Sequence, residues 1–283
     1  MRGLPAGVVE RIVAAALAED LGAPGDITTD CVVAESVRAR GRIVARQDLV
    51  LAGLPVARQV FRALAPELAF EALEEEGARA ARGTALARLE GAARPILRGE
   101  RTALNFLGRM SGIATAARAA VEEIAGTGAR ILDTRKTAPG LRVLDKYAVA
   151  VGGASNHRMG LFDAVLIKDT HLGTGLTVGA AVRRALEAGH PRESVTIEVR
   201  DVAELAQAID AGAGRALLDN MNATQVAEAV RFAAGRIELE VSGGLRPGSL
   251  RQLAATGVDY LSLGWLTHSA PAADVALDVE VAA

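Results

Sequence analysis

Lysine is confined to one part of this sequence. Of the 32 basic residues only three are lysine, and Lys136, Lys146 and Lys168 all lie between Ile131 and His171. Arginine and lysine exchange readily on an exposed surface, but in a tight site lysine is a compact charge with a movable pKa and arginine a planar fork. We therefore expect Lys136 and Lys168 to do chemistry, and Lys146 to lie on a solvated helix.

Further charged side chains follow apolar segments near these lysines. Arg135, His157 and Arg158 add cationic candidates, and arginine forks bind carboxylates through two hydrogen bonds. Glu198 and Asp219 end two apolar segments and could bind Mg²⁺, directly or through water and sugar hydroxyls. Salt-bridged strand ends are the alternative. The pattern predicts a pocket for a polyanion, with a carboxylate-binding part and a divalent ion.

Glycines after the last two predicted strands add a phosphate-binding part. The segments are Ser242-Gly243-Gly244 and Leu263-Gly264. Without a Cβ, backbone N–H groups at such positions can approach a phosphate closely. Parallel barrels often bind phosphate at these two loops, although glycine also serves ordinary turns. Their position favours a phosphate site.

Short apolar segments alternate with amphipathic helices after residue 129. Such alternation predicts a parallel sheet, and no GxGxxG follows its first strand, so a (β/α) barrel is favoured over a dinucleotide-binding sheet. Each strand ends in polar or glycine residues, which a barrel would gather on one face. The predicted strands are 130–133, 164–168, 195–199, 216–219, 237–241 and 260–264. The predicted helices are 178–188, 202–211, 223–234 and 249–255.

The N-terminal part mixes strands and helices without regular alternation. This indicates an α+β module, followed by a long helix over 95–125 that forms the domain boundary. A polar turn is predicted at 25–30. The other predicted elements are helices 5–21 and 54–64 and strands 37–44, 49–53, 69–73 and 85–89.

Composition narrows the class of protein. A net charge of −2 and a pI of about 6.1 argue against non-specific nucleic-acid binding. No segment approaches the ~20 apolar residues of a membrane span. The single cysteine, Cys31, cannot form an internal disulfide, which favours a cytoplasmic protein. We expect Cys31 to be a buried core residue, because free cysteine is commonly buried.

The sequence resembles quinolinate phosphoribosyltransferases over most of its length. The most specific motifs are DTRKT, NHR and IKD, at matching spacings. The segments that carry the resemblance are AEDLGAPGDITT (18–29), ERTALNFL (100–107), SGIAT (111–115), ILDTRKTAPGLR (131–142), KYAV with NHRMGLFD (146–163), LIKDTH (166–171), IEV (197–199), LLDNM (217–221), SGG (242–244) and GVDYLSLGWLTHS (257–269).

The resemblance implies a fold and a reaction. The fold is an α/β architecture with an N-terminal sandwich domain over 1–112, an incomplete parallel (β/α) barrel over 113–270, and a tail, 271–283, that returns to the sandwich. The reaction joins quinolinate to phosphoribosyl pyrophosphate with Mg²⁺. It gives nicotinate mononucleotide, pyrophosphate and CO₂, a step of NAD biosynthesis.

The resemblance also implies roles for individual residues. Lys136, Lys168, Glu198 and Asp219 are the catalytic candidates. Quinolinate is met by Arg101, Arg135, His157, Arg158 and Lys168. Lys136 meets the pyrophosphate or the reacting end, and Thr134 is a further substrate-binding residue. Glu198 and Asp219 meet the ribose and the metal. The 5′-phosphate is met by Ser242, Gly243, Gly244, Leu263, Gly264 and Trp265. The resemblance further implies a homodimer in which Arg101 reaches the neighbouring subunit's site, and it leaves a hexamer open.

Four residues depart from the family pattern. They are Ala138, Thr170, Arg200 and Trp265, and only Trp265, beside the phosphate loop, bears on the site. We expect altered packing there and no loss of function, because backbone N–H groups still serve the phosphate.

Two other functions fit some of the same residues. Lys168 at a strand end could be the Schiff-base lysine of an aldolase-type barrel. A non-catalytic barrel could bind the sugar phosphate without releasing pyrophosphate.

Overall fold

The computed structural model describes residues 3–282, and the chain forms two compact units. The small-sheet unit contains residues 3–118, 137–153 and 266–282, and the parallel-sheet unit contains residues 119–136 and 154–265. Segment 137–153, placed in the barrel domain from the sequence, therefore groups with the small sheet. No helix of the described residues has both the length and the apolar character needed to cross a membrane.

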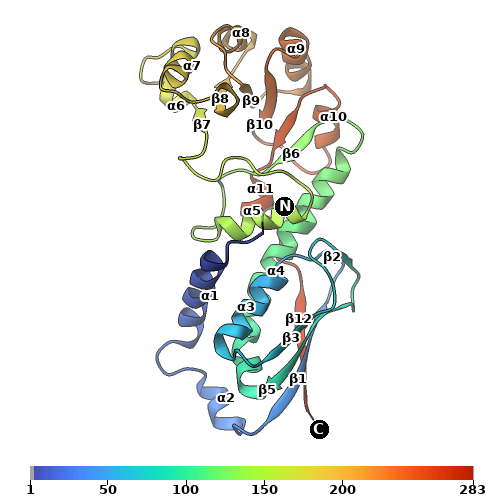
Figure 1. The fold of residues 1–283 in the computed structure, drawn as a ribbon. Helices are drawn as coiled ribbons and strands as arrows, with labels where there is room; N and C mark the ends of the chain where they lie inside the picture. Colours follow the sequence, from blue (N-terminus) through green and yellow to red (C-terminus); the bar gives the residue numbers. More distant parts are fainter. Residues whose placement is uncertain (1–2, 283) are drawn as a thin grey trace. The chain divides into compact units, whose positions relative to one another are not determined.

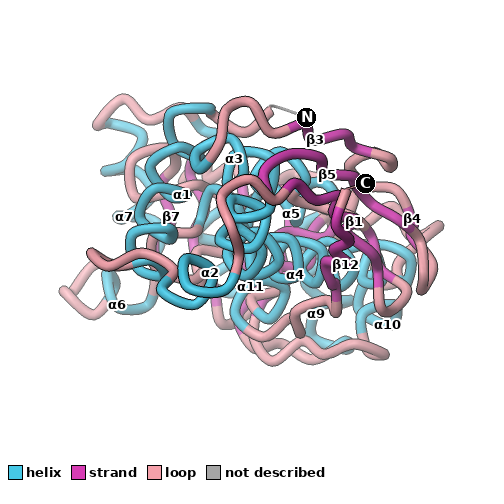
Figure 2. Tube along the Cα trace, turned by 90° about the horizontal axis from the view of Figure 1, so that it is seen from below, coloured by secondary structure: helices cyan, strands magenta, loops and turns pink. Residues whose placement is uncertain are grey.

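A four-stranded antiparallel sheet is the centre of the small-sheet unit. Its strand order is β12-β1-β5-β3, and β1 lies between β5 and β12 (Figures 1 and 2). A short pair, β2 with β4, accompanies it. The strands are β1 Arg38–Ala45, β2 Leu49–Val50, β3 Ala69–Ala72, β4 Arg79–Ala80, β5 Ala85–Ala92 and β12 Val275–Val281. The helices are α1 Ala6–Leu21, α2 Ile27–Val32, α3 Leu54–Leu64, α4 Ala93–Glu123, α5 Arg142–Val151 and α11 Trp265–His268. Residues 119–123 of α4 and Trp265 of α11 belong to the parallel-sheet unit.

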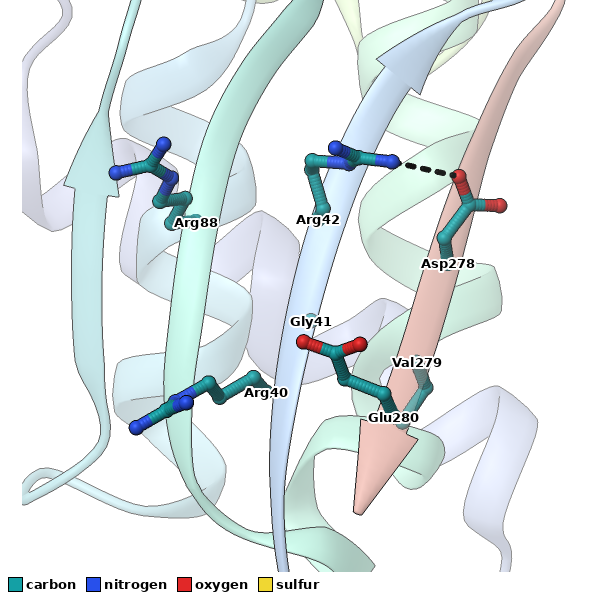
Figure 3. A pocket seen from close by; sticks show the side chains of 7 residues that line it. All are labelled: Arg40, Gly41, Arg42, Arg88, Asp278, Val279 and Glu280. Atoms are coloured by element: carbon teal, nitrogen blue, oxygen red, sulfur yellow. Dashed lines mark ion pairs between the residues drawn. The ribbon is translucent and has the colours of Figure 1, made fainter. Parts of the chain in front are cut away.

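The two faces of this sheet differ in chemistry. Along β1, Ala39 and Ile43 are buried while the arginines between them are exposed, as expected for a half-buried strand. On the outer face, arginines 40, 42 and 88 surround a shallow hollow of about 350 Å³ together with Asp278 and Glu280 (Figure 3). Two of these arginines have local partners, because Arg40 lies 3.6 Å from Glu90 and Arg42 lies 3.9 Å from Asp278.

Helix α4 has small residues where the C-terminal segment crosses it. A Cβ at Gly112 would lie 2.0 Å from the Pro271 carbonyl oxygen, and one at Gly108 would lie 2.8 Å from that of Ala273. Both are far inside contact distance, so only glycine permits this crossing. The crossing leads into β12, which pairs antiparallel with β1.

The parallel-sheet unit has six parallel strands in the order β6-β11-β10-β9-β8-β7. Successive strands from β7 to β11 are neighbours, and β6 pairs with β11, so the order would be cyclic if β6 also paired with β7. The sheet stays open at that point, as an incomplete barrel does. The strands are β6 Arg130–Leu132, β7 Val165–Ile167, β8 Val195–Val199, β9 Arg215–Asp219, β10 Glu238–Ser242 and β11 Tyr260–Ser262, and the helices are α6 Asp169–Leu172, α7 Val178–Glu187, α8 Val202–Asp210, α9 Ala223–Ala233 and α10 Leu250–Ala254, with the short η1 Arg192–Ser194.

Three expectations from the sequence are wrong. The predicted turn at 25–30 is largely the start of α2, because the Asp26 side chain accepts a hydrogen bond from the Thr29 backbone N–H and so caps a helix. Lys146 is buried, with 1% of its surface exposed, and does not lie on a solvated face. Cys31 is exposed on α2 and is not a core residue.

Candidate active site

The strand ends of the parallel-sheet unit surround a cavity of about 570 Å³. Its wall contains four Arg or Lys side chains and three carboxylates, with histidine, amide, hydroxyl and glycine groups between them. The lining residues are Thr134, Arg135, Lys136, His157, Arg158, Leu166, Lys168, Glu198, Leu217, Asp219, Asn220, Glu240, Ser242, Gly243, Gly244 and Ser262. Eleven of the fifteen site residues expected from the sequence are in this set.

The parallel sheet explains why residues far apart in sequence meet here. Residues 134–136 follow β6, Lys168 follows β7, and Glu198 lies near the end of β8. Asp219 and Ser242 are the last residues of β9 and β10, and they stand opposite each other in the strand register. Since parallel strands point the same way, all these side chains arrive at the carboxyl edge of one sheet.

Two arginines form a cationic wall with buried N–H groups that no acceptor among the described residues satisfies. The Nε atoms of Arg135 and Arg158 are buried and have no hydrogen-bond partner among the described residues. Burial, and then the nearby charge of Arg135, lower the pKa of Arg158 despite the opposing effect of Asp163. An anion with several oxygens would satisfy the buried N–H groups and relieve the repulsion.

The acidic wall is partly neutralised by lysine. Lys168 Nζ donates a hydrogen bond to Glu198 Oε1 at 2.7 Å, and the Asp169 backbone N–H donates to Glu198 Oε2 at 3.2 Å. Burial, and then the charge of Glu198, raise the pKa of Asp219. A cation between these two carboxylates would therefore stabilise both.

Asn220 joins Asp219 to the glycine loop. Its backbone has a φ of 54°, its N–H donates to the Ser242 carbonyl at 3.0 Å, and its side-chain amide donates to Asp219 at 2.8 Å. A Cβ on Gly243 would lie 2.2 Å from Asn220 Oδ1, and Gly243 has a φ of 100°. Both facts require glycine at 243.

Sequence reasoning missed several polar residues at this site. Asn220, Glu240 and Ser262 line the cavity. Asp133 is fully buried and accepts hydrogen bonds from Asn156 Nδ2 and the His157 N–H, both at 2.7 Å, so it connects the 134–136 loop to His157. A carboxylate at the end of an apolar strand was the available signal for Asp133. The strand position of Glu240, two residues before Ser242, was the signal for Glu240.

Four expected site residues are not in the cavity wall. Arg101 is exposed on α4 of the small-sheet unit. Leu263 is buried, and its N–H donates to the Leu132 carbonyl at 2.9 Å, so that N–H is already used within the sheet. Gly264 and Trp265 follow Leu263 at the end of β11, and the Nε1 of Trp265 is buried without a hydrogen-bond partner among the described residues.

Comparison with known proteins gives consistent matches along the chain. Residues 26–111 match the quinolinate phosphoribosyl transferase N-terminal domain, and residues 113–278 match the C-terminal domain. Quinolinate phosphoribosyltransferase (decarboxylating) 1 of Nicotiana glauca is 37% identical over 287 residues, which cover 95% of this chain and 81% of that protein. The probable nicotinate-nucleotide pyrophosphorylase (carboxylating) of Bacillus subtilis is 37% identical over 261 residues, covering 92% and 90%.

Solved structures give the same result. The nicotinate-nucleotide pyrophosphorylase of Francisella tularensis superposes with a TM-score of 0.91 at 37% identity, covering 98% of each chain. NadC of Streptococcus pyogenes superposes with a TM-score of 0.94 at 33% identity, covering 100% of each chain.

Proposed function

Because this chain belongs to the quinolinate phosphoribosyltransferase family, we propose that it converts quinolinate and phosphoribosyl pyrophosphate to nicotinate mononucleotide, pyrophosphate and CO₂ in NAD biosynthesis. The observation that carries the proposal is the cationic wall. Arg135 and Arg158 present buried Nε–H groups that have no acceptor within the described part of the chain, which suits a dicarboxylate substrate.

Quinolinate binds at this cationic wall. Arg135 and Arg158 bind its two carboxylates, and Lys168 completes the charge balance at the inner edge. Removing these charges from water makes each ion pair stronger than it would be in solution. The pyridine nitrogen is thereby held toward the acidic wall, where the ribose binds.

Phosphoribosyl pyrophosphate occupies the opposite part of the cavity. Glu198 and Asp219 hold the ribose hydroxyls, Lys136 meets the pyrophosphate, and the backbone N–H groups of Gly243 and Gly244 meet the 5′-phosphate. Glycine at both positions, with φ values of 100° and 63°, supports this assignment, because N–H groups without a Cβ nearby suit anions.

We propose that Mg²⁺ accompanies this substrate. Among the described residues no group of three metal-ligating side chains exists, so a fully protein-built site does not fit. Two carboxylates do fit, since Mg²⁺ is usually held by one or two of them plus substrate oxygens and water. Glu198 and Asp219 would hold the ion, which when bound supplies positive charge to the departing pyrophosphate.

The order of charges in the cavity supports the reaction. As pyrophosphate leaves, the ribose becomes oxocarbenium-like, and the carboxylates of Glu198 and Asp219 stabilise that positive charge. The pyridine nitrogen then attacks the anomeric carbon and becomes cationic. This ring charge stabilises the carbanion left when the adjacent carboxylate departs as CO₂. Lys168 or an ordered water protonates the carbanion.

An aldolase-type role for Lys168 does not fit this environment. A Schiff-base lysine must be a neutral amine to attack a carbonyl. Lys168 Nζ instead donates a hydrogen bond to Glu198 Oε1 at 2.7 Å, so its nitrogen is engaged by a carboxylate and not free to attack.

We also propose a homodimer in which Arg101 supplies a cation to the neighbouring subunit's cavity, and a cytoplasmic location. The exposure of Arg101 outside the parallel-sheet unit supports the first. The single cysteine supports the second.

The experiment that tests the function measures nicotinate mononucleotide and CO₂ from quinolinate and phosphoribosyl pyrophosphate with Mg²⁺. The transferase gives the two products in equal amounts. Release of neither product would reject the function. Borohydride trapping of a carbonyl compound on Lys168 would support the aldolase instead.

A further inference from the structure

Glu240 is a buried carboxylate in the cavity wall for which the division of substrates above has no use. It lies on β10 with its side chain fully buried. Ser262 Oγ donates to its Oε1 at 2.5 Å, and a terminal nitrogen of Arg215 lies 3.3 Å from its Oε2. The third neighbour is His157 Nε2, 3.5 Å from Oε1. Three donors thus surround one carboxylate.

These donors keep Glu240 ionised in spite of its burial. Burial alone would raise the pKa of Glu240, but the hydrogen bonds from His157 and Ser262 and the charge of Arg215 hold that pKa below its ordinary value. A buried carboxylate with satisfied oxygens is a rigid acceptor. Its negative charge faces the Nε2 atom of His157.

The ring of His157 is held from both sides. The backbone N–H of Arg158 donates to His157 Nδ1 at 2.7 Å. Since a backbone N–H can only donate, Nδ1 carries no proton, and the ring proton is on Nε2, facing Glu240. The backbone N–H of His157 donates to Asp133 at 2.7 Å. The peptide that carries Arg158 into the cavity is therefore fixed by the tautomer of the residue before it.

We propose that Glu240 is a positioning residue for quinolinate binding, which fixes the Nε2–H tautomer of His157 and through it the backbone of Arg158. The proposal rests on the function proposed above. In the other tautomer, the Nδ1–H of His157 would face the N–H of Arg158, two donors without an acceptor. Arg158 would then move away, and with it a guanidinium of the cationic wall.

The first test reads the tautomer directly. The chain has four histidines, so the side-chain nitrogen resonances of ¹⁵N-labelled protein can be assigned with a His157→Gln variant. From the geometry we expect a proton on Nε2 of His157 and none on Nδ1. A neutral Nδ1–H form or a doubly protonated ring in the wild-type protein would overturn the proposal, whether or not any variant of Glu240 folds.

The second test compares two glutamates of one strand. Glu238 lies two residues before Glu240 and pairs with the same Arg215 at 2.9 Å, but from the exposed side. We expect Glu240→Gln to weaken quinolinate binding, measured by calorimetry, at least tenfold and to populate both His157 tautomers. Glu238→Gln should change neither by more than twofold. Equal weakening by both variants, or an unchanged tautomer in Glu240→Gln, would show that Glu240 is only a structural residue.

A double variant shows whether the effect passes through His157. In a His157→Gln background, adding Glu240→Gln should change quinolinate affinity by less than twofold, because the contact is already absent. A further tenfold loss would mean that Glu240 acts by another path, contrary to the proposal. Neither the spectrum nor the calorimetry requires turnover. Failure to form nicotinate mononucleotide would therefore count against the proposed function only. The role of Glu240 would still be decided by the tautomer of His157.

Discussion

The ion pair between Lys168 and Glu198 orients the lysine ammonium in the cavity in the absence of substrate. The 2.7 Å contact holds the ammonium beside Glu198 and screens one of two adjacent carboxylates. A guanidinium in its place would be larger and planar and would reach Glu198 from a different angle. The identity of the cation therefore matters at this position.

Lys136→Arg and Lys168→Arg should each lower kcat/KM at least tenfold, which is about 1.4 kcal/mol of transition-state stabilisation. Steady-state assays of nicotinate mononucleotide formation measure this. The control is the reverse exchange at an exposed position, Arg200→Lys, whose side chain is 73% exposed and pairs with Glu204. It should leave kcat/KM unchanged. Wild-type activity in Lys168→Arg would mean that the scarcity of lysine carries no information there.

We expect the ionised carboxylate of Asp219 to destabilise the fold, although binding of phosphoribosyl pyrophosphate requires it. Because burial and Glu198 raise the pKa of Asp219, the folded protein binds this proton more tightly than the unfolded chain. The stability that this proton contributes is fully present below the pKa of Asp219 in the unfolded chain. It is lost as the pH rises through the higher pKa of Asp219 in the folded protein. At pH 7 the ionised carboxylate therefore destabilises the fold. Asp219→Asn should raise Tm by about 1–3 °C and should weaken phosphoribosyl pyrophosphate binding more than quinolinate binding.

Thermal unfolding and calorimetry with each substrate provide these measurements. Asp274→Asn, at an exposed carboxylate of the small-sheet unit, is the control and should change neither quantity. At pH 3, where both forms of Asp219 are largely protonated, the Tm difference should disappear. Equal weakening of both substrates would contradict the division of the cavity.

At the scale of elements, the β10 loop depends on two glycines that differ in their surroundings. Gly243 combines a φ of 100° with a close approach to Asn220, whereas Gly244 has a φ of 63° and open space around its Cβ position. Gly243→Ala should cost about 3 kcal/mol of stability from strain and the clash, and should raise the KM for phosphoribosyl pyrophosphate at least tenfold.

Gly244→Ala is the matched comparison and should cost about 1 kcal/mol, the usual left-handed penalty. Denaturant unfolding and steady-state kinetics distinguish the two variants. If both variants lost equal stability, the contact with Asn220 would not be what restricts residue 243.

Much of the parallel sheet could be predicted from the sequence, because its strands are short apolar segments that end in polar residues. Residues 195–199, for example, form β8 as predicted. Helix α5 was not predicted, and α2 was taken for a turn because six residues give too little periodicity. Short helices are decided by caps and tertiary contacts, which a window of sequence does not reveal.

Charged residues in the interior were the least predictable part of the site. Lys146, Asp133 and Glu240 are all buried. The strand positions of Asp133 and Glu240 mark them as candidates, but the neighbouring sequence does not show what any of the three contacts. Their partners come from other strands and loops, as with Ser262 and Glu240. Most of the charged residues that line the cavity could be named from sequence, but the residues that hold them in place required the fold.

At the scale of the whole molecule, the proposed dimer leads to a complementation experiment. Arg101→Ala and Lys168→Ala should each be nearly inactive, since each removes a cation from a carboxylate-binding cavity. If Arg101 serves the neighbouring subunit, a mixed dimer has one intact site and one doubly defective site. Random reassortment of equal amounts gives about half mixed dimers, so about a quarter of the sites should recover.

The two variants are unfolded and refolded together, exchange is checked by native mass spectrometry, and nicotinate mononucleotide formation is assayed. Each variant refolded alone is the control for recovery without exchange. Mixed dimers that stay inactive would place Arg101 in its own subunit's site or give it a purely structural role.

The pairing of β12 with β1 has a consequence for how the protein is made. Strand β1 leaves the ribosome early, but its partner over residues 275–281 is translated only after the whole parallel-sheet unit. Until then one edge of the small sheet has unpaired N–H and C=O groups and is open to association with other chains. The first-made unit is thus the last to be completed, and we expect nascent chains lacking β12 to depend most on chaperones.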